Sequence, residues 1–262
     1  MNFYSNTFEV NAIVNNSIET VAKIMASQVK DWISSLNIKM ILSEENTYGS
    51  DDSYRHQLFY NYPGILHYIR IHFHTSYSSG RYYVYYGVDF FNNSTRNDNQ
   101  YYSYSIEKNK IFRYSFSILT GNKSVFISPN SKFIDSAYRL CFFNTYDKNG
   151  DNIVFVSNGY NNLHSGNIYY DNRIDSGNHV TGSYSRIPFT DISLDTDDEC
   201  FLIPFFFYDG NSSDSKMRYK VDDMYYVFGK KFIAGSKYSI DGQKYYCVRA
   251  IDYSSIMVKL DN

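Results

Sequence analysis

Residues 65–74, with the sequence ILHYIRIHFH, alternate along the chain between two sets of side chains. Successive side chains of a β-strand point to opposite faces, so every second residue of such a segment shares a face. One set contains Ile65, His67, Ile69, Ile71 and Phe73, and the other contains Leu66, Tyr68, Arg70, His72 and His74. The first set is mainly apolar, and the second ends in three ionisable residues. The segment therefore predicts a β-strand with one face toward a core.

The same period of two residues continues through most of the chain after this strand. Tyr, Phe, Val and Ile are frequent in these segments, and such side chains suit the pleated surface of a sheet. We predict further strands near residues 81–91, 101–106, 110–119, 138–146, 152–157, 167–171, 200–208, 216–221, 224–228, 237–240, 244–251 and 256–260. Asp241 and Gly242 separate two of these strands and predict a two-residue hairpin turn.

One segment before these strands has a helical pattern instead. Between residues 16 and 37, apolar residues recur at the spacing of one face of an α-helix. These residues are Ile18, Val21, Ala22, Met25, Val29, Trp32, Ile33 and Leu36. Asn16, with Glu19 three residues later, predicts the N-cap, and Asn37 suits a left-handed C-cap. We therefore predict an amphipathic helix over residues 16–37.

One N-terminal helix followed by many short strands predicts the α+β class, with mainly antiparallel sheets in a sandwich or a barrel-like arrangement. Short strands are also expected near residues 7–14 and 39–42, on either side of the helix. The sequence has no repeat and no proline-rich linker, so we expect a single β-rich domain over residues 1–262. Two polar stretches interrupt the pattern. Residues 43–55 are expected to be an exposed loop, and residues 159–186 a long excursion from the core that contains a hairpin.

The composition excludes several classes of protein. The 262 residues include 29 Tyr and 20 Phe, so the chain can bury enough apolar surface to fold. Only 3 Cys occur, without paired spacings, which excludes a disulfide scaffold and predicts buried thiols. The formal net charge of -2 does not suit sequence-specific binding of nucleic acid. The most apolar run, at residues 200–208, is too short to span a bilayer, so we expect no membrane insertion.

Candidate chemistry is sparse, and each candidate has a simpler structural interpretation. His72 and His74 share a face of one predicted strand, as in some metal sites, but hydrogen bonding on a wet sheet face is the simpler interpretation. Acidic residues at 147–152 and 195–199 are compatible with a hard cation, although a turn and an exposed loop are simpler. Motifs for nucleotide binding or nucleophilic catalysis do not occur. We therefore predict no catalytic, cofactor-binding or metal-binding residues and no enzyme activity.

Tyrosine is the most informative residue type, because its side chain combines a large apolar ring with a polar tip. The predicted strand at 81–91 contains Tyr82, Tyr83, Tyr85 and Tyr86, so both of its faces carry rings. We expect at least one of these faces to meet another layer, a loop or another subunit. Across the whole chain, the number of rings predicts that other polypeptides cover some of them.

The leading helix, the strands rich in Tyr and Asn and the C-terminal hairpins resemble virion structural proteins of tailed bacteriophages. The C-terminal similarity lies in residues 228–232 (FGKKF) and 238–245 (YSIDGQKY). The resemblance implies a non-enzymatic component of the neck, tail or baseplate that needs no cofactor. It also implies a location in the virion, after assembly in the host cytoplasm, and contacts with other virion proteins and with copies of itself.

Two alternative functions stay open. A receptor- or glycan-binding β-sandwich would stack Tyr rings on sugars and hold sugar hydroxyls with Asn and Asp side chains. A metal-dependent enzyme would use His72 and His74 as ligands. Binding to glycans would support the first alternative, and loss of activity in a double His→Ala variant would support the second.

Overall fold

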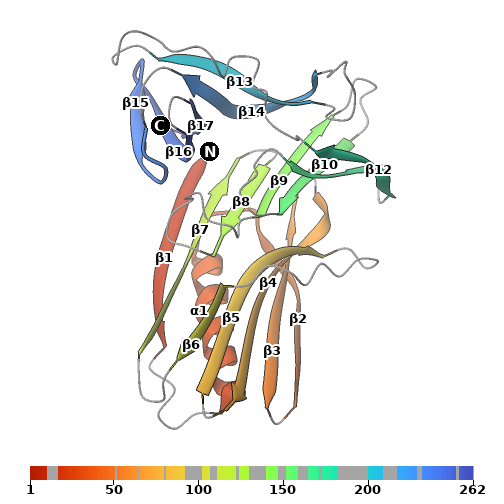
Figure 1. The fold of residues 1–262 in the computed structure, drawn as a ribbon, viewed down its shortest axis with the longest axis vertical. Helices are drawn as coiled ribbons and strands as arrows, with labels where there is room; N and C mark the ends of the chain where they lie inside the picture. Colours follow the sequence, from red (N-terminus) through yellow and green to blue (C-terminus); the bar gives the residue numbers. More distant parts are fainter. Residues whose placement is uncertain are drawn as a thin grey trace. The chain divides into compact units, whose positions relative to one another are not determined.

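The computed structural model describes residues 1–10, 17–50, 52–63, 65–79, 81–91, 102–106, 111–121, 124–129, 140–146, 152–158, 165–170, 173–181, 200–208, 217–228, 232–251 and 254–261. These ranges contain one helix, α1 (Ile18–Ser35), and seventeen strands, shown in Figure 1. The strands are β1 (Asn2–Val10), β2 (Ile41–Ser50), β3 (Ser53–Tyr62), β4 (Ile65–Ser78), β5 (Arg81–Phe91), β6 (Tyr102–Ile106), β7 (Phe112–Thr120), β8 (Ser124–Ser128), β9 (Leu140–Tyr146), β10 (Asn152–Asn158), β11 (Ser165–Tyr170), β12 (Arg173–Thr181), β13 (Phe201–Tyr208), β14 (Met217–Phe228), β15 (Lys237–Ile240), β16 (Gln243–Ile251) and β17 (Ser254–Lys259).

The strands form three sheets. One has seven strands in the order β1-β7-β8-β9-β10-β11-β12. The other two have five strands each, in the orders β2-β3-β4-β5-β6 and β13-β14-β17-β16-β15. All strand pairs from β2 to β6, from β9 to β12 and from β13 to β17 are antiparallel. The predicted class, mainly antiparallel β-structure with one helix near the N-terminus, is confirmed.

The residues group into two compact units. The first unit contains Met1–Tyr4, Ile118–Phe126 and Lys132–Asn262, and the second contains Ser5–Ser117 and Ile127–Ser131. Strands β1, β7 and β8 each contribute residues to both units. The chain therefore passes between the units repeatedly, and no single cut in the sequence separates them.

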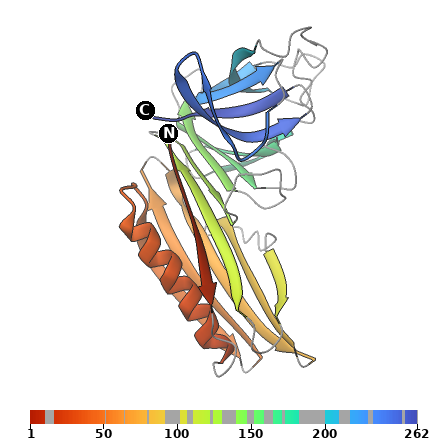
Figure 2. The same cartoon turned by 90° about the vertical axis from the view of Figure 1, so that its left-hand side faces the viewer.

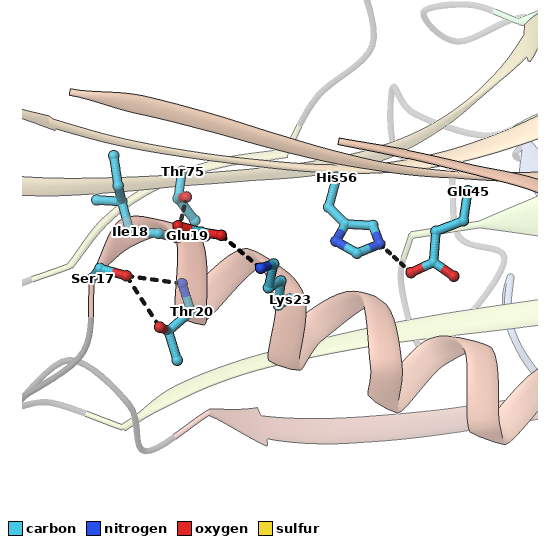
Figure 3. Close-up of polar contacts among 8 residues, drawn as sticks. All are labelled: Ser17, Ile18, Glu19, Thr20, Lys23, Glu45, His56 and Thr75. Carbon is cyan, nitrogen blue, oxygen red and sulfur yellow. Dashed lines mark hydrogen bonds and ion pairs between the residues drawn. The ribbon is translucent and has the colours of Figure 1, made fainter. Parts of the chain in front are cut away.

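Helix α1 begins with a serine cap. The Oγ of Ser17 accepts a hydrogen bond from the backbone N–H of Thr20 at 3.2 Å (Figure 3). Ser17 therefore satisfies one of the free N–H groups of the first turn, and the predicted N-cap at Asn16 is wrong. After the last helical residue, Leu36 has an extended conformation with φ of -83°. The predicted left-handed cap at Asn37 is wrong as well.

The helix lies along one face of the sheet β2–β6 (Figure 2). Its buried residues are Ile18, Val21, Ala22, Met25, Ala26, Val29 and Ile33, which largely match the predicted apolar face. They face buried residues of β3 and β4, including Leu58, Tyr60, Ile69, Ile71 and Phe73. Thr75 of β4 fixes the start of the helix, because its hydroxyl donates to the carbonyl of Ile18 at 2.6 Å (Figure 3).

An aromatic cluster completes the core on this face of the sheet. Tyr114 of β7 stacks on Phe8 of β1, with ring centroids 5.0 Å apart. Tyr114 also lies edge-on to Phe73 of β4 at 6.3 Å and to Tyr86 of β5 at 5.4 Å. Phe116 contacts the same two rings at 6.2 Å and 5.6 Å. One face of β5 thus meets another layer, as the sequence predicted.

The predicted exposed loop at residues 43–55 is wrong. These residues form most of β2 and the start of β3, and the two strands stay paired as far as Ser50 and Ser53. Within the described sheet, β2 has β3 as its single neighbour, and most of its side chains are exposed. Polar side chains cost little free energy at such an edge, so the polar composition indicated an edge strand rather than a loop.

The two strands predicted on either side of Asp223 form one strand, β14. Asp223 has a φ of 61°, in the left-handed region. Pairing with β13 shifts at this point, because Pro204 pairs with Tyr225 whereas Phe206 pairs with Lys220. A bulge therefore interrupts the strand, and it produces the break in alternation that the sequence shows.

The excursion predicted at residues 159–186 contains β11 and β12, which pair with each other as an antiparallel hairpin. The other residues of that stretch lie outside the described part of the chain. Strand β8 was not predicted, because its central residues Val125, Phe126 and Ile127 are consecutive apolar residues that show no alternation. The strand expected at residues 7–14 corresponds to β1, which begins earlier, at Asn2, and residues 11–14 lie outside the described part of the chain.

The predicted hairpin at Asp241 and Gly242 is confirmed. Both residues have positive φ, 49° and 76°, as a type I′ turn requires, and Ile240 pairs with Gln243 across the turn. The core beside this hairpin contains Val227, Phe232, Ile240, Tyr245, Cys247 and Met257. In the part of the chain that the structure describes, no helix has the length and hydropathy to cross a bilayer.

Candidate functional site

The face of the sheet β2–β6 opposite helix α1 carries polar and aromatic side chains in rows. Residues that are paired across neighbouring strands share a face and lie on strands about 4.8 Å apart. One row, which we call the aromatic–basic row, contains Tyr48, Arg55, His74 and Tyr85, from β2 to β5. The next row toward the β2–β3 turn, which we call the serine row, contains Ser50, Ser53, Ser76 and Tyr83.

His74 links the two rows. Its Nε2 lies 2.8 Å from the Oγ of Ser53, and its ring stacks on Tyr85 with centroids 5.1 Å apart. Burial lowers the pKa of His74 to about 4, and the positive charge of Arg55 adds to this effect. His74 is therefore neutral near pH 7 and presents an uncharged imidazole to the serine hydroxyl.

Arg55 supplies the positive charge of the aromatic–basic row. Its side chain is half-buried, and it forms no ion pair with any carboxylate among the described residues. On one side, its neighbour Tyr48 donates a hydrogen bond to the Oε1 of Gln57, which holds the exposed tyrosine ring in place. The row thus presents one guanidinium group beside aromatic rings, and no carboxylate of a described residue neutralises it.

Further from the β2–β3 turn, the same face is buried. Gln57 and His72 pair across β3 and β4, and Arg70 pairs with Phe59 in the following row. All four side chains are nearly inaccessible to solvent. Both Arg70 and His72 make further interactions within the fold. This end of the face is therefore structural, and the open rows are the candidate site.

A second polar cluster lies on the helix side of the sheet. Glu45 of β2 contacts Lys30 of the helix at 2.9 Å and the Nε2 of His56 at 2.6 Å, the latter shown in Figure 3. Burial lowers the pKa of His56, so the neutral ring donates to Glu45. Burial alone would raise the pKa of Glu45, but its bonds to Lys30 and His56 outweigh this effect and lower it. The cluster fastens the edge strand β2 to the helix and to β3.

The predicted histidine pair shares one face of β4, but its two members have different environments. His72 is buried, whereas His74 is half-buried and bonded to a serine. Among the described residues, no group of three His, Cys, Asp or Glu side chains is placed to hold a metal ion. The acidic side chains considered at residues 147–152 and 195–199 lie outside the described part of the chain.

The prediction that the cysteines are buried thiols is met in part. Cys247 is a buried free thiol in the core of the C-terminal sheet, as predicted. Cys200 is also a free thiol, but it is half-buried. The side chain of Cys141 lies outside the described part of the structure.

Sequence reasoning missed two members of the aromatic–basic row, because Tyr48 and Arg55 fell within the supposed loop. A usable signal lies in residues 54–60, where Tyr54, His56, Leu58 and Tyr60 alternate with other residues. This alternation predicts a strand that directs Arg55 away from the core. The position of Tyr48 beside Arg55 depends on the pairing of β2, for which the sequence has no comparable signal.

Comparisons with known proteins identify no family and no relative of this chain. No family model matches the chain, and no curated protein matches its sequence.

Proposed function

We propose that the protein is a non-enzymatic structural component of a phage virion, in the neck, tail or baseplate, that acts through contacts with other virion proteins and with copies of itself. One observation supports this function: within the part of the chain that the structure describes, large apolar side chains stay exposed at or beside the edge strands of both five-stranded sheets. An open strand edge is a template for pairing with another chain. The place in a virion follows from the resemblance of the helix, the Tyr- and Asn-rich strands and the C-terminal hairpins.

In the sheet β2–β6, the edge strand β2 is ten residues long. Its first residue, Ile41, is 66% exposed, and Tyr48 near its other end is 44% exposed. Full burial of a side chain such as Ile41 contributes about 1.5–3 kcal/mol, and an isolated copy of the chain gains only a part of this because Ile41 stays largely exposed. The edge therefore favours contact with a further polypeptide.

The sheet β13–β17 has the same feature. Phe201 begins the edge strand β13 and is 52% exposed, and Ile233, shortly before the edge strand β15, is 69% exposed. The backbone of Ile233 is held in place, because its N–H donates to the Oη of Tyr238 at 2.8 Å. An ordered, exposed apolar side chain beside an open edge is typical of the centre of an interface.

The number of aromatic residues does not by itself support the proposal. The chain's own core buries many of the rings, among them Tyr60, Phe73, Tyr114 and Tyr246. Among the described residues, the large aromatic side chains that stay exposed are Tyr48, Tyr77 and Phe201. The sheet edges, rather than the abundance of tyrosine, are therefore the supporting observation.

Multi-angle light scattering of the purified protein, over a range of concentrations, tests the proposal. We expect a ring or a larger oligomer that dissociates when a lysine charge is placed at an open edge, in Ile41→Lys or Ile233→Lys. Ile111→Lys is the matched control, because Ile111 is 53% exposed but precedes β7, which has neighbours on both sides. A wild-type protein that stays monomeric and joins no particle contradicts the proposal.

Receptor or glycan binding is the second candidate function. The aromatic–basic row supports it, because the row combines aromatic rings, hydroxyl groups and one unneutralised guanidinium on a sheet face. A glycan array without any binding, together with Tyr→Ala variants that change no interaction, would argue against this function.

A further inference from the structure

The aromatic–basic row is accessible, whereas the rows that contain Gln57 and Arg70 on the same sheet face are buried. Tyr48 is exposed, and Arg55, His74 and Tyr85 are half-buried. The row crosses four strands and therefore spans about 14 Å, perpendicular to the strand direction. A peptide that extends a sheet runs parallel to the edge strand, so the direction of the row does not suit that mode of binding.

The charge of the row favours an anionic ligand. Arg55 is half-buried and has no carboxylate partner among the described residues, and its planar guanidinium can bind a carboxylate through two parallel hydrogen bonds. His74 is neutral near pH 7 and adds no competing charge. Glu44 lies on the same face two rows away, where it accepts a hydrogen bond from Asn46 at 2.6 Å.

The surroundings of Arg55 favour a sugar as the carrier of the carboxylate. The hydroxyl of Tyr48 is bonded to Gln57, so the exposed ring is a fixed apolar surface for the C–H groups of a sugar ring. The adjacent serine row adds the half-buried hydroxyls of Ser53 and Ser76. Hydroxyl groups both donate and accept hydrogen bonds, which matches the hydroxyls of a carbohydrate.

We infer that the aromatic–basic row binds a carbohydrate that carries a carboxylate group. Arg55 holds the carboxylate, the ring of Tyr48 packs against the sugar ring, and the serine row bonds to the sugar hydroxyls. This inference rests on the second candidate function, glycan binding. It does not depend on the proposed role in assembly, because the assembly variants at Ile41 and Ile233 lie outside the row. Failure of either test therefore leaves the other result unaffected.

Saturation-transfer NMR titrations with methyl β-glucuronide and methyl β-glucoside test the inference, because these sugars differ by a carboxylate. We expect the glucuronide to bind at least about tenfold more tightly, through its charge-assisted hydrogen bonds. Arg55→Gln is expected to abolish this difference. The control Arg113→Gln removes the same charge from an exposed residue of β7 and is expected to preserve it.

Thermal unfolding shows whether Arg55→Gln folds. If it does not fold, a second variant provides the test. Tyr48→Leu changes an exposed residue and is expected to weaken binding of the glucuronide several-fold. Equal binding of the two sugars, or binding of neither at millimolar concentrations, overturns the inference. N-acetylglutamate amide is a third probe, and binding as tight as that of the glucuronide would identify an acidic protein segment as the ligand and overturn the sugar assignment.

Discussion

Removal of the Tyr114 hydroxyl gives a direct test of how helix α1 is held to the strands of its unit. The Oη of Tyr114 lies 3.0 Å from the carbonyl oxygen of Met25 and 2.9 Å from the Oε1 of Gln28, so the hydroxyl donates to the helix. The ring itself is buried and stacks on Phe8. Tyr114→Phe removes the hydrogen bonds and keeps the ring, whereas Tyr114→Ala removes both.

The expected losses in the free energy of unfolding follow from these contacts. Tyr114→Phe should cost about 1 kcal/mol, the usual net contribution of a buried hydrogen bond. The loss stays moderate, because Met25 lies within the helix and Gln28 keeps its bond to the carbonyl of Glu9 at 3.0 Å. Tyr114→Ala should cost about 3–5 kcal/mol, because it removes a ring from the centre of the aromatic cluster.

Urea denaturation followed by tryptophan fluorescence measures both losses. The chain has 1 Trp, and Trp32 packs edge-on against Phe8 at 5.8 Å in the same unit as Tyr114. Tyr77→Phe is the matched control, because it removes the same hydroxyl from an exposed residue and should change stability by less than about 0.5 kcal/mol. If Tyr114→Phe costs no more than Tyr77→Phe, or if Tyr114→Ala costs less than about 1 kcal/mol, the described role of Tyr114 is wrong.

Three further changes have defined outcomes. His74 has a lower pKa in the folded protein than its ordinary value of 6.5, so the folded state loses stability as the pH falls from 6.5 toward 4. After allowance for solvent screening, His74→Asn should reduce this decrease in the free energy of unfolding by about 2 kcal/mol, as measured by urea titrations at several pH values. If the variant loses as much stability as the wild type over this pH range, the reasoning is wrong. Thr75→Val removes the bond to Ile18 and should lower the free energy of unfolding by about 1 kcal/mol, whereas an unchanged denaturation midpoint would refute that anchoring role. Gly242→Ala meets no atom within 4 Å but must adopt a φ of 76°, so about 1 kcal/mol of destabilisation is expected, and a variant as stable as the wild type would contradict the turn assignment.

Local pattern was sufficient to identify most of the elements. The apolar spacing of helix α1 predicted nearly all of its buried residues, because one face of a helix packs against a single layer. The turn at Asp241 and Gly242 was predicted for a similar reason, since few residue pairs accept positive φ at two successive positions. The errors at Asn16 and Asn37 concern helix ends, where several neighbouring polar residues are able to serve as caps.

The candidate site was predictable only in its central strand. The alternation in β4 placed His72 and His74 on one face, but it did not show that His72 is buried or that His74 bonds to Ser53. Tyr48 was assigned to a loop, because an edge strand needs few apolar residues and its composition is similar to that of a turn. The row that surrounds Arg55 therefore appeared only after the strands were paired.

Side-chain periodicity is a local property of the chain, and it was sufficient to assign helix α1 and most of the strands together with their apolar faces. The edge strand β2 and the short strand β8 were exceptions. The tertiary structure alone decided the register that aligns Tyr48, Arg55, His74 and Tyr85, and the division of β1, β7 and β8 between two units. Register and unit membership depend on contacts between residues that are distant in the sequence. Each such contact is chosen by packing against the rest of the fold, which no single segment encodes.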